Sequence, residues 1–249
     1  MIPTDIGVPL LYRDALMLVI DKPAGLPVHP GPKGGPTLTD RLDDLRFGLP
    51  RRPQAAHRLD RDTSGCLVLG RHPKALARLN KLFADGRVEK TYWSIVEGAP
   101  QDESGVIDLA LAKRSEDPRS WWMKPDPAGD PALTRWRVLG RSPDGAGAWL
   151  ELSPETGRTH QLRVHCAAMG WPIRGDTIYG TAPRQGGPGL QLHARSLGLP
   201  LYPKRPPIRI AAPPHAHMAA GLFACGFSES APVPYPSETV LAAGKAIPD

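Results

Sequence analysis

The sequence predicts a fold with many strands and few helices, because two hydrophobic patterns recur along it in unequal number. Short apolar runs rich in β-branched and aromatic residues are typical of strands. Apolar residues spaced three and four apart are typical of amphipathic helices. The strand pattern occurs at residues 16–20, 66–69, 89–97, 133–139, 148–153, 190–197 and 207–210. The helical pattern occurs at residues 37–45, 73–86 and 158–169.

The composition is that of an ordinary globular protein, with 249 residues, 41% hydrophobic residues and a formal charge of +6. A chain of this length can fold as one large domain or two small ones. The charge favours a polyanionic partner, but by itself it is weak support for nucleic-acid binding. Three widely separated cysteines without a Cys-x-x-Cys pair suggest neither a disulfide framework nor a zinc site. No apolar run has the roughly 18 residues of a membrane span, and no signal-peptide pattern is present, so we expect a cytoplasmic protein.

The first predicted strand, residues 16–20, runs into a turn at residues 21–25. The next stretch, residues 27–36, is rich in glycine and proline and is expected to form a loop. Three leucines between residues 38 and 45 then repeat at helical spacing, which predicts a short helix that packs on the core.

A second helix is predicted to begin at Pro73 and to end near Gly86. Its leucines share one face, whereas Lys74, Arg78 and Lys81 share the other. Such a charged face is usually only solvated, although in an RNA-binding protein it can also meet phosphates.

Residues 113–131 interrupt the strand pattern with charged residues, prolines, glycines and the pair Trp121 and Trp122. We expect a long irregular surface excursion rather than a domain boundary. The two tryptophans could stack on bases or pin the loop to the protein.

The third predicted helix covers residues 158–169, with Gly170 at its C-terminal cap. It places Arg158, His160, Arg163 and His165 near its beginning, and two arginines at a helix N-terminus favour an anion site. The two histidines lack the spacing and the carboxylate of a zinc motif, so we expect them to be satisfied within the protein or to face RNA.

The segment from His57 to Gly65 carries the strongest chemical signal, because it sets polar and small residues just before a buried strand. Asp60 and Asp62 lie two residues apart and could form an acid and base pair. Alternatively, they could only accept hydrogen bonds from amides of the loop. Spacing alone does not choose between these interpretations.

The segment His-Arg-Leu-Asp-Arg-Asp-Thr-Ser-Gly at residues 57–65 resembles the nucleophile motif of the RluA-type pseudouridine synthases. Four further segments, in the same order, resemble that family, and they are residues 21–30, 87–92, 157–165 and a final pair at 175–180 and 190–194. The resemblance implies an α+β fold with a mixed, mostly antiparallel sheet, flanked by helices and loops around a catalytic cleft. Ordered segments over most of the chain are much more specific than any single motif.

The resemblance also implies the roles of individual residues. Asp60 would be the catalytic carboxylate, and Tyr92 would contact the flipped uracil and help to move its proton. Arg163 would be the basic partner of the aspartate, with Arg158 as the second choice. A cation near the carboxylate would keep it ionised at neutral pH.

Substrate binding would involve Arg58, Arg158, His160 and Leu192. Leu192 would pack beside the base, and Arg58 would fill the space that a flipped nucleotide leaves. The target uridine must leave the RNA stack, because its N1–C1′ bond breaks and the base rotates before it rejoins through C5. Neither a cofactor nor a metal is expected, and the expected partner is structured rRNA or tRNA.

The resemblance predicts a catalytic domain over residues 1–227. The lack of a periodic pattern after Phe227 predicts a C-terminal tail over residues 228–249 that is partly disordered or loosely docked. The S4-type RNA-binding domain with which many family members begin is expected to be absent, and a monomer is expected. Asp21 and Ser94 depart from residues common in the family, but neither belongs to the implied chemistry.

Two other functions compete with this interpretation. A non-catalytic RNA-binding protein would explain the charge and the resemblance without turnover. A hydrolase or glycosidase would use Asp60 together with Asp62 or Glu155, since paired carboxylates also cleave glycosidic bonds. That alternative leaves the other matching segments unexplained.

Overall fold

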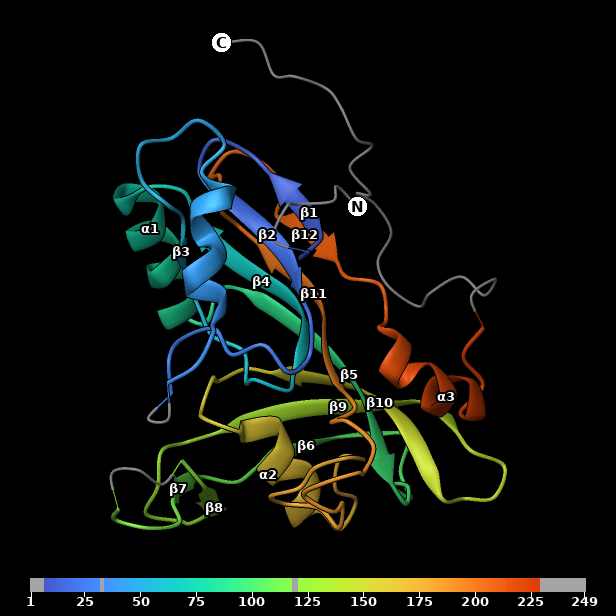
Figure 1. The fold of residues 1–249 in the computed structure, drawn as a ribbon. Helices are drawn as coiled ribbons and strands as arrows, with labels where there is room; N and C mark the ends of the chain where they lie inside the picture. The colour runs from blue at the N-terminus through green and yellow to red at the C-terminus, as the bar shows by residue number, and fades with distance from the viewer. Residues whose placement is uncertain (1–6, 32–33, 118–120, 229–249) are drawn as a thin grey trace. The chain divides into compact units, whose positions relative to one another are not determined.

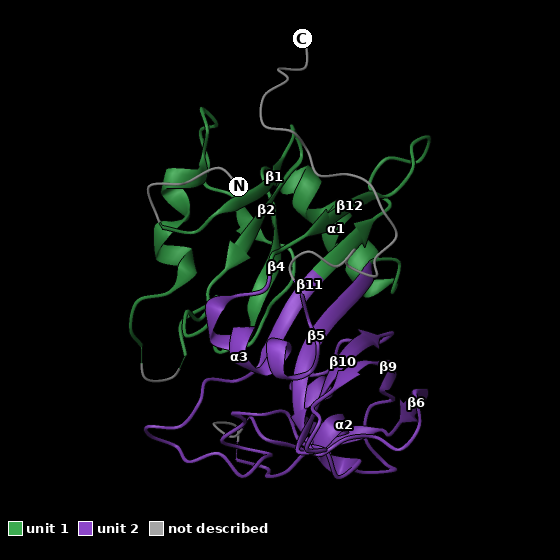
Figure 2. Cartoon of the chain, turned by 90° about the vertical axis from the view of Figure 1, so that its right-hand side faces the viewer, with its two compact units in different colours: residues 1–88, 196–213, 234–249 green, residues 89–195, 214–233 purple. Residues whose placement is uncertain are grey.

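The computed structural model describes residues 7–31, 34–117 and 121–228, and the chain forms two compact units (Figure 2). Unit 1 comprises residues 1–88, 196–213 and 234–249, and unit 2 comprises residues 89–195 and 214–233. The strand β11 (Leu192–Leu199) contributes its first half to unit 2 and its second half to unit 1. The predicted boundary at residue 227 stays a prediction, because nearly all of the proposed tail lies outside the described residues.

Unit 1 is organised around strands in the order β1-β2-β4-β11, with β3 paired to β4 and β12 paired to β11 (Figure 1). The pairs β1/β2 and β2/β4 are antiparallel. Every residue of β2 and β4 is buried, which explains why their sequences are apolar without alternation. The bounds of these strands are β1 (Leu10–Arg13), β2 (Met17–Lys22), β3 (Gln54–Ala55), β4 (Ser64–Gly70) and β12 (Ile208–Ala211).

The helix α1 (Pro73–Ala84) confirms the pattern that begins at Pro73. The His72 side chain accepts a hydrogen bond from the Ala75 amide at 3.3 Å and so caps the helix. Leu79 and Leu82 lie in the buried cluster that β2, β4 and β12 also line, which is the core of unit 1. The three cations on the opposite face are exposed, as predicted.

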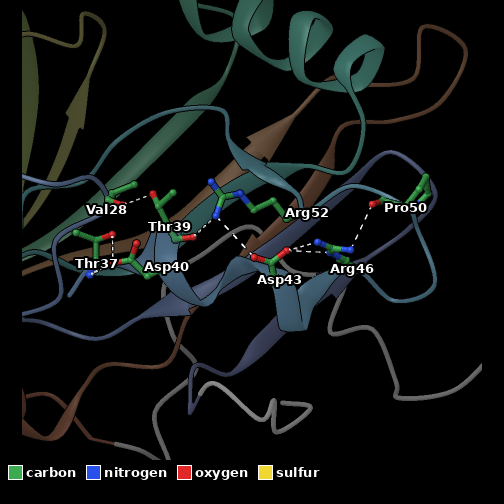
Figure 3. A network of polar contacts seen from close by, with 8 residues as sticks. All are labelled: Val28, Thr37, Thr39, Asp40, Asp43, Arg46, Pro50 and Arg52. Carbon is green, nitrogen blue, oxygen red and sulfur yellow. Dashed lines mark hydrogen bonds and ion pairs between the residues drawn. The ribbon is translucent and has the colours of Figure 1, made fainter.

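The predicted short helix is the 3-10 helix η1 (Leu38–Leu45), and its three leucines are buried. A network of polar contacts holds η1 to the chain on either side of it (Figure 3). The Thr39 hydroxyl donates to the Val28 carbonyl at 2.7 Å, and Arg52 donates to the Thr39 carbonyl at 3.2 Å. Asp43 forms ion pairs with Arg46 and Arg52. The loop before η1 is therefore tied to the chain after it.

Unit 2 contains strands in the order β11-β5-β10-β9-β6, and the pairs among β5, β10, β9 and β6 are antiparallel. A separate two-stranded sheet, β7 with β8, extends from it. The helices of this unit are α2 (Gln161–Ala168) and α3 (Ala216–Ala224). The bounds of its strands are β5 (Glu89–Glu97), β6 (Ser104–Asp108), β7 (Leu111–Lys113), β8 (Met123–Pro125), β9 (Leu133–Arg141) and β10 (Gly147–Pro154).

The expected α+β fold with mostly antiparallel pairing is confirmed by these elements. The three cysteines are free and buried, as expected of core residues. Among the described residues, no helix is both long and apolar enough to cross a membrane.

Two predictions about local structure were wrong. The stretch 113–131 is not irregular throughout, because residues 123–125 form β8 and pair with β7. The third helix begins at Gln161 rather than at residue 158, because His160 has a left-handed backbone with φ of 54°. A left-handed residue cannot continue an α-helix, so Arg158 and His160 precede α2, whereas Arg163 and His165 lie on it.

Candidate active site

Asp60 lies in a tight turn that leads directly into the buried strand β4. The Thr63 amide donates a hydrogen bond to the Asp60 carbonyl at 3.1 Å, which closes a four-residue turn. Leu59 and Thr63 on either side are buried, whereas the Asp60 side chain is half-buried and Arg58 is exposed. The backbone of the turn is thus fixed while its carboxylate reaches the surface.

His57 holds the beginning of this segment against the rest of unit 1. The Val68 amide of β4 donates to His57 Nε2 at 3.0 Å, and the His57 ring stacks on Phe83 with ring centroids 4.4 Å apart. These contacts give the histidine of the motif a positioning role that its sequence pattern alone did not indicate.

Lys22 is a further residue of this site that the sequence analysis missed. It ends β2 with no solvent exposure, and its ammonium donates to the carbonyls of Pro23, Leu26 and Arg61 at 2.8–2.9 Å. Burial lowers the pKa of Lys22 to about 8, and the carboxylates of Asp62 and Asp60 oppose that shift. The buried cation therefore joins the turn after β2 to the turn that carries the aspartate.

The Gly25 amide makes the same connection, because it donates to the Arg61 carbonyl at 2.9 Å. Gly25 has φ of 85°, a conformation that a side chain would disfavour. The only signal for this arrangement in the sequence was the charged pair Asp21 and Lys22 at the end of an apolar run.

Unit 2 contains a buried ion pair between Arg163 of α2 and Asp176. Arg163 Nε donates to Asp176 Oδ2, and a terminal nitrogen donates to Oδ1, both at 2.8 Å. Asp176 Oδ1 also accepts the amides of Ile178 and Tyr179. Burial alone would raise the pKa of Asp176, but Arg163 and the two amides outweigh it and hold that pKa below its usual value.

Tyr179 connects this ion pair to two other segments. Its ring lies 5.3 Å from the guanidinium carbon of Arg163, which is a cation–π distance. Its hydroxyl lies 2.9 Å from His160 Nδ1 and accepts the Met123 amide at 2.8 Å. The structure thus brings together Arg163 and His160, two of the residues predicted from the sequence.

Arg158 lies apart from this cluster. It is exposed, and its Nε donates to the Pro131 carbonyl at 3.0 Å. His165 is fully buried between the Thr134 hydroxyl and the Leu109 carbonyl, at 2.9 and 3.0 Å. His165 is therefore a satisfied core residue, which was one of the two expected roles for the histidines.

Tyr92 and Leu192 share one hydrophobic environment in unit 2. Leu192, at the start of β11, belongs to a buried cluster that also contains Leu152 and Leu162, and Tyr92 of β5 packs against that cluster. The two residues predicted to contact the base thus belong to the same largely buried apolar cluster. The pairing of Asp60 with Arg163 or Arg158 stays a prediction.

Both candidates for the second carboxylate of the glycosidase alternative, Asp62 and Glu155, have arginine partners. Asp62 forms an ion pair with Arg61, and Glu155 forms one with Arg135. Within the described ranges, no group of three or more histidine, cysteine or carboxylate side chains could hold a metal ion.

The similarity to known proteins shows to which family this chain belongs. The model of a family described as RNA pseudouridylate synthase matches residues 16–168, which is more than half of the chain. The chain belongs to the RNA pseudouridylate synthase family. Family members of this kind are isomerases that act on RNA, so the RluA-type resemblance is confirmed.

Individual RNA pseudouridine synthases match over most of this chain. An uncharacterized one from Zymomonas mobilis is 44% identical over 198 residues, which cover 79% of this chain and 90% of that protein. Ribosomal large subunit pseudouridine synthase D of the same organism is 35% identical, with coverage of 79% and 66%. The chain spans 57–64% of the length of three longer curated relatives.

A solved structure shares the fold of this synthase. Human RNA Pseudouridylate Synthase Domain Containing 4 superposes with a TM-score of 0.72 at 28% identity. The superposition covers 86% of this chain and 92% of the human one.

Lys22→Met is expected to lower the free energy of unfolding by about 2–4 kcal/mol, because three carbonyls lose their donor. Since all six tryptophans lie in unit 2, far-UV circular dichroism in guanidinium is the suitable measurement for this change in unit 1. Lys74→Met on the exposed face of α1 is the matched control, with an expected effect within about 0.5 kcal/mol.

The pH dependence gives this prediction a second readout. Burial lowers the pKa of Lys22 in the native protein to about 8, whereas the usual value for lysine is 10.5. The unfolded chain therefore binds more protons between these values, and the stability of the wild type relative to Lys22→Met should rise with pH there. The role given to Lys22 would be contradicted if the stability difference between the wild type and Lys22→Met did not change with pH and was no larger than that of Lys74→Met.

Asp176→Asn should destabilise unit 2 by about 3–5 kcal/mol at neutral pH, because it leaves the buried Arg163 without its counter-charge. Tryptophan fluorescence during guanidinium unfolding reports on this unit. Asp43→Asn, which breaks exposed ion pairs, is the control and should cost about 0–1 kcal/mol when followed by circular dichroism.

The effect of Asp176→Asn should also depend on pH. The pKa of Asp176 in the native protein lies below the usual 3.8, so the wild type keeps its full advantage above that value and loses it as the pH falls further. If the Asp176→Asn protein were as stable as the wild type at neutral pH, the ion pair would not hold this site together.

Proposed function

We propose that this protein isomerises specific uridines to pseudouridine in rRNA or tRNA, with Asp60 as the essential carboxylate. The observation that carries the proposal is the placement of Asp60 on a turn whose backbone is fixed on both sides. The Thr63 amide closes the turn, and the buried Lys22 binds the carbonyl of the next residue, Arg61. A nucleophile must be held in one geometry if it is to attack a specific atom.

The chemistry requires one strong nucleophile and a closed pocket. The N1–C1′ bond breaks, the uracil rotates, and a C5–C1′ bond forms; C5 then loses its hydrogen and N1 gains one, so the product is an isomer. Asp60 can serve by adding to C6 of the ring or by acting at C1′. The detached base must stay beside the sugar, since recapture then becomes far more probable than escape.

The target nucleotide must be flipped out of the RNA helix before this rearrangement. We propose that Arg58, which is exposed next to Asp60 in the motif, fills the space that the nucleotide leaves. Tyr92, which is half-buried, and Leu192, which lies in the apolar cluster against which Tyr92 packs, would then contact the flipped uracil.

The family resemblance also assigns roles to basic residues. Arg163 would keep the Asp60 carboxylate ionised, and the bidentate pair with Asp176 would fix its guanidinium. Arg158 and His160 would bind the RNA backbone. Arg158 is exposed, and His160 is oriented by Tyr179. No cofactor is needed for this reaction.

Ribosomal RNA is the substrate class that the relatives support best. One curated relative is named as a ribosomal large subunit pseudouridine synthase, although it shares only 35% of its residues with this chain over the matched region. We expect the protein to act as a cytoplasmic monomer without an obligate protein partner.

Asp60→Asn is expected to lower the rate of isomerisation by about 10³-fold or more, because it removes the nucleophile. The measurement is tritium release from total RNA of cells that lack the gene, grown with [5-³H]uridine, since product formation expels the C5 hydrogen. RNA binding should be nearly unchanged, because only one negative charge is lost.

Asp62→Asn is the matched control, since it makes the same chemical change two residues away, on a half-buried side chain that pairs with Arg61. It should keep most of the tritium release. Appreciable turnover by the Asp60→Asn protein would refute the mechanism, and equal losses in both variants would favour a pair of carboxylates.

Tyr92→Phe separates packing against the base from chemistry of the hydroxyl. If the phenol moves a proton, kcat should fall by about 10²-fold or more while KM changes little. Tyr92→Leu, which also removes the ring, should lower both kcat and the affinity for RNA. Full activity of the phenylalanine variant would exclude the phenol as an acid or base.

A further inference from the structure

The sheet of β7 and β8 carries two adjacent tryptophans at the surface. Trp121 is 46% exposed and Trp122 is 36% exposed. The Arg114 amide donates to the Trp122 carbonyl at 2.7 Å, so the ladder continues one residue beyond the strands and fixes the backbone of Trp122. Large aromatic side chains that stay partly exposed offer flat faces on which a ligand can pack.

Two arginines flank the ring of Trp122. The guanidinium carbons of Arg114 and Arg184 each lie 5.8 Å from its centroid, and both side chains are exposed. In the part of the chain that the structure describes, neither arginine forms an ion pair with a carboxylate, whereas Lys124 pairs with Asp126. Exposed Glu116 is the acidic residue nearest in sequence to Arg114. The surface thus combines an aromatic face with cations that have no ionic partner among the described residues.

The two-stranded sheet of β7 and β8 contacts α2 and Tyr179, which belong to the candidate active site. Leu111 of β7 is fully buried in a cluster with Ala132 and Val164, and Val164 follows Arg163 on α2. The Met123 amide of β8 donates a hydrogen bond to the Tyr179 hydroxyl, and the Tyr179 ring lies against Arg163. Whatever the tryptophans bind is therefore held at a fixed position relative to Arg163.

We infer that Trp121 and Trp122, together with Arg114 and Arg184, bind unpaired nucleotides that flank the target uridine in the substrate RNA. Unpaired bases offer their faces for stacking on aromatic rings, and the arginines suit the adjacent phosphates. A duplex hides the faces of its bases, so the site selects single-stranded or looped RNA. This inference rests on the proposed function, because it takes Arg163 to be part of the catalytic site.

The test uses binding of a fluorescein-labelled oligouridine and of an RNA duplex of equal length, measured by fluorescence anisotropy. The double variant Trp121→Leu/Trp122→Leu keeps apolar side chains but cannot stack, and Trp121→Phe/Trp122→Phe retains aromatic rings. The leucine variant should bind oligouridine at least roughly tenfold more weakly, whereas the phenylalanine variant should stay within about threefold of the wild type. Binding to the duplex should be unchanged in both variants.

A further control is Arg184→Gln, which should weaken oligouridine binding and reduce its salt dependence. The fluorescence of the tryptophans, of which four remain in the double variants and six in Arg184→Gln, reports whether unit 2 is folded. Unchanged oligouridine binding by the leucine variant, or equal losses with leucine and phenylalanine, would overturn the inference. It would also be overturned if the leucine variant lost only self-association in sedimentation, since the patch would then bind a second copy of the chain.

Binding of oligouridine does not depend on turnover, so the Asp60→Asn protein should bind it like the wild type. If that protein binds normally but the wild type releases no tritium, the RNA surface stands and the proposed activity fails. If the leucine variant releases tritium normally and keeps its affinity for RNA, the proposed activity is supported and the proposed RNA-binding surface is refuted.

Discussion

The buried ion pair between Arg163 and Asp176 is the interaction on which the polar part of unit 2 depends. Two charges removed from water are tolerated only when their hydrogen bonds are nearly complete, and here both oxygens of the carboxylate are used. The pair fixes the turn at residues 176–180, and Tyr179 in that turn then orients His160 and binds β8. One ion pair therefore connects the helix α2, a loop and a surface hairpin.

Unit 1 uses a buried cation in a different way. Lys22 has no carboxylate in direct hydrogen-bond contact among its described partners, and its ammonium instead donates to three backbone carbonyls. Those carbonyls belong to the turn after β2 and to the turn that carries Asp60. In both units a buried cation thus fixes backbone near residues that the family resemblance assigns to catalysis, and such preorganisation favours attack on a single atom.

Hydrophobic periodicity predicted the elements that bury one face in the core. It failed where backbone geometry, or pairing between strands, determines the secondary structure. The strand over residues 89–97 and the helix at Pro73 were predicted closely, since apolar spacing alone specifies them. The start of α2 was misplaced because the left-handed conformation of His160 leaves no periodic signal. The short strand β8 and the helix α3 were missed, since the first is stabilised by pairing with β7 and the second has an apolar sequence of low amphipathicity.

The sequence motifs identified the candidate residues, but the residues with which they form hydrogen bonds and ion pairs could not be predicted from spacing. The pairing of Arg163 with Asp176 and the contacts of Lys22 join residues that folding brings together. We propose that the protein isomerises uridine in RNA and that Asp60 is the essential carboxylate. The most direct measurement is nucleotide-resolution mapping of pseudouridine in total RNA from cells with the gene, without it, and with only an Asp60→Ala form. We expect that one or a few sites are lost without the gene and are not restored by the variant. An unchanged map, or full restoration by Asp60→Ala, would contradict the role of Asp60.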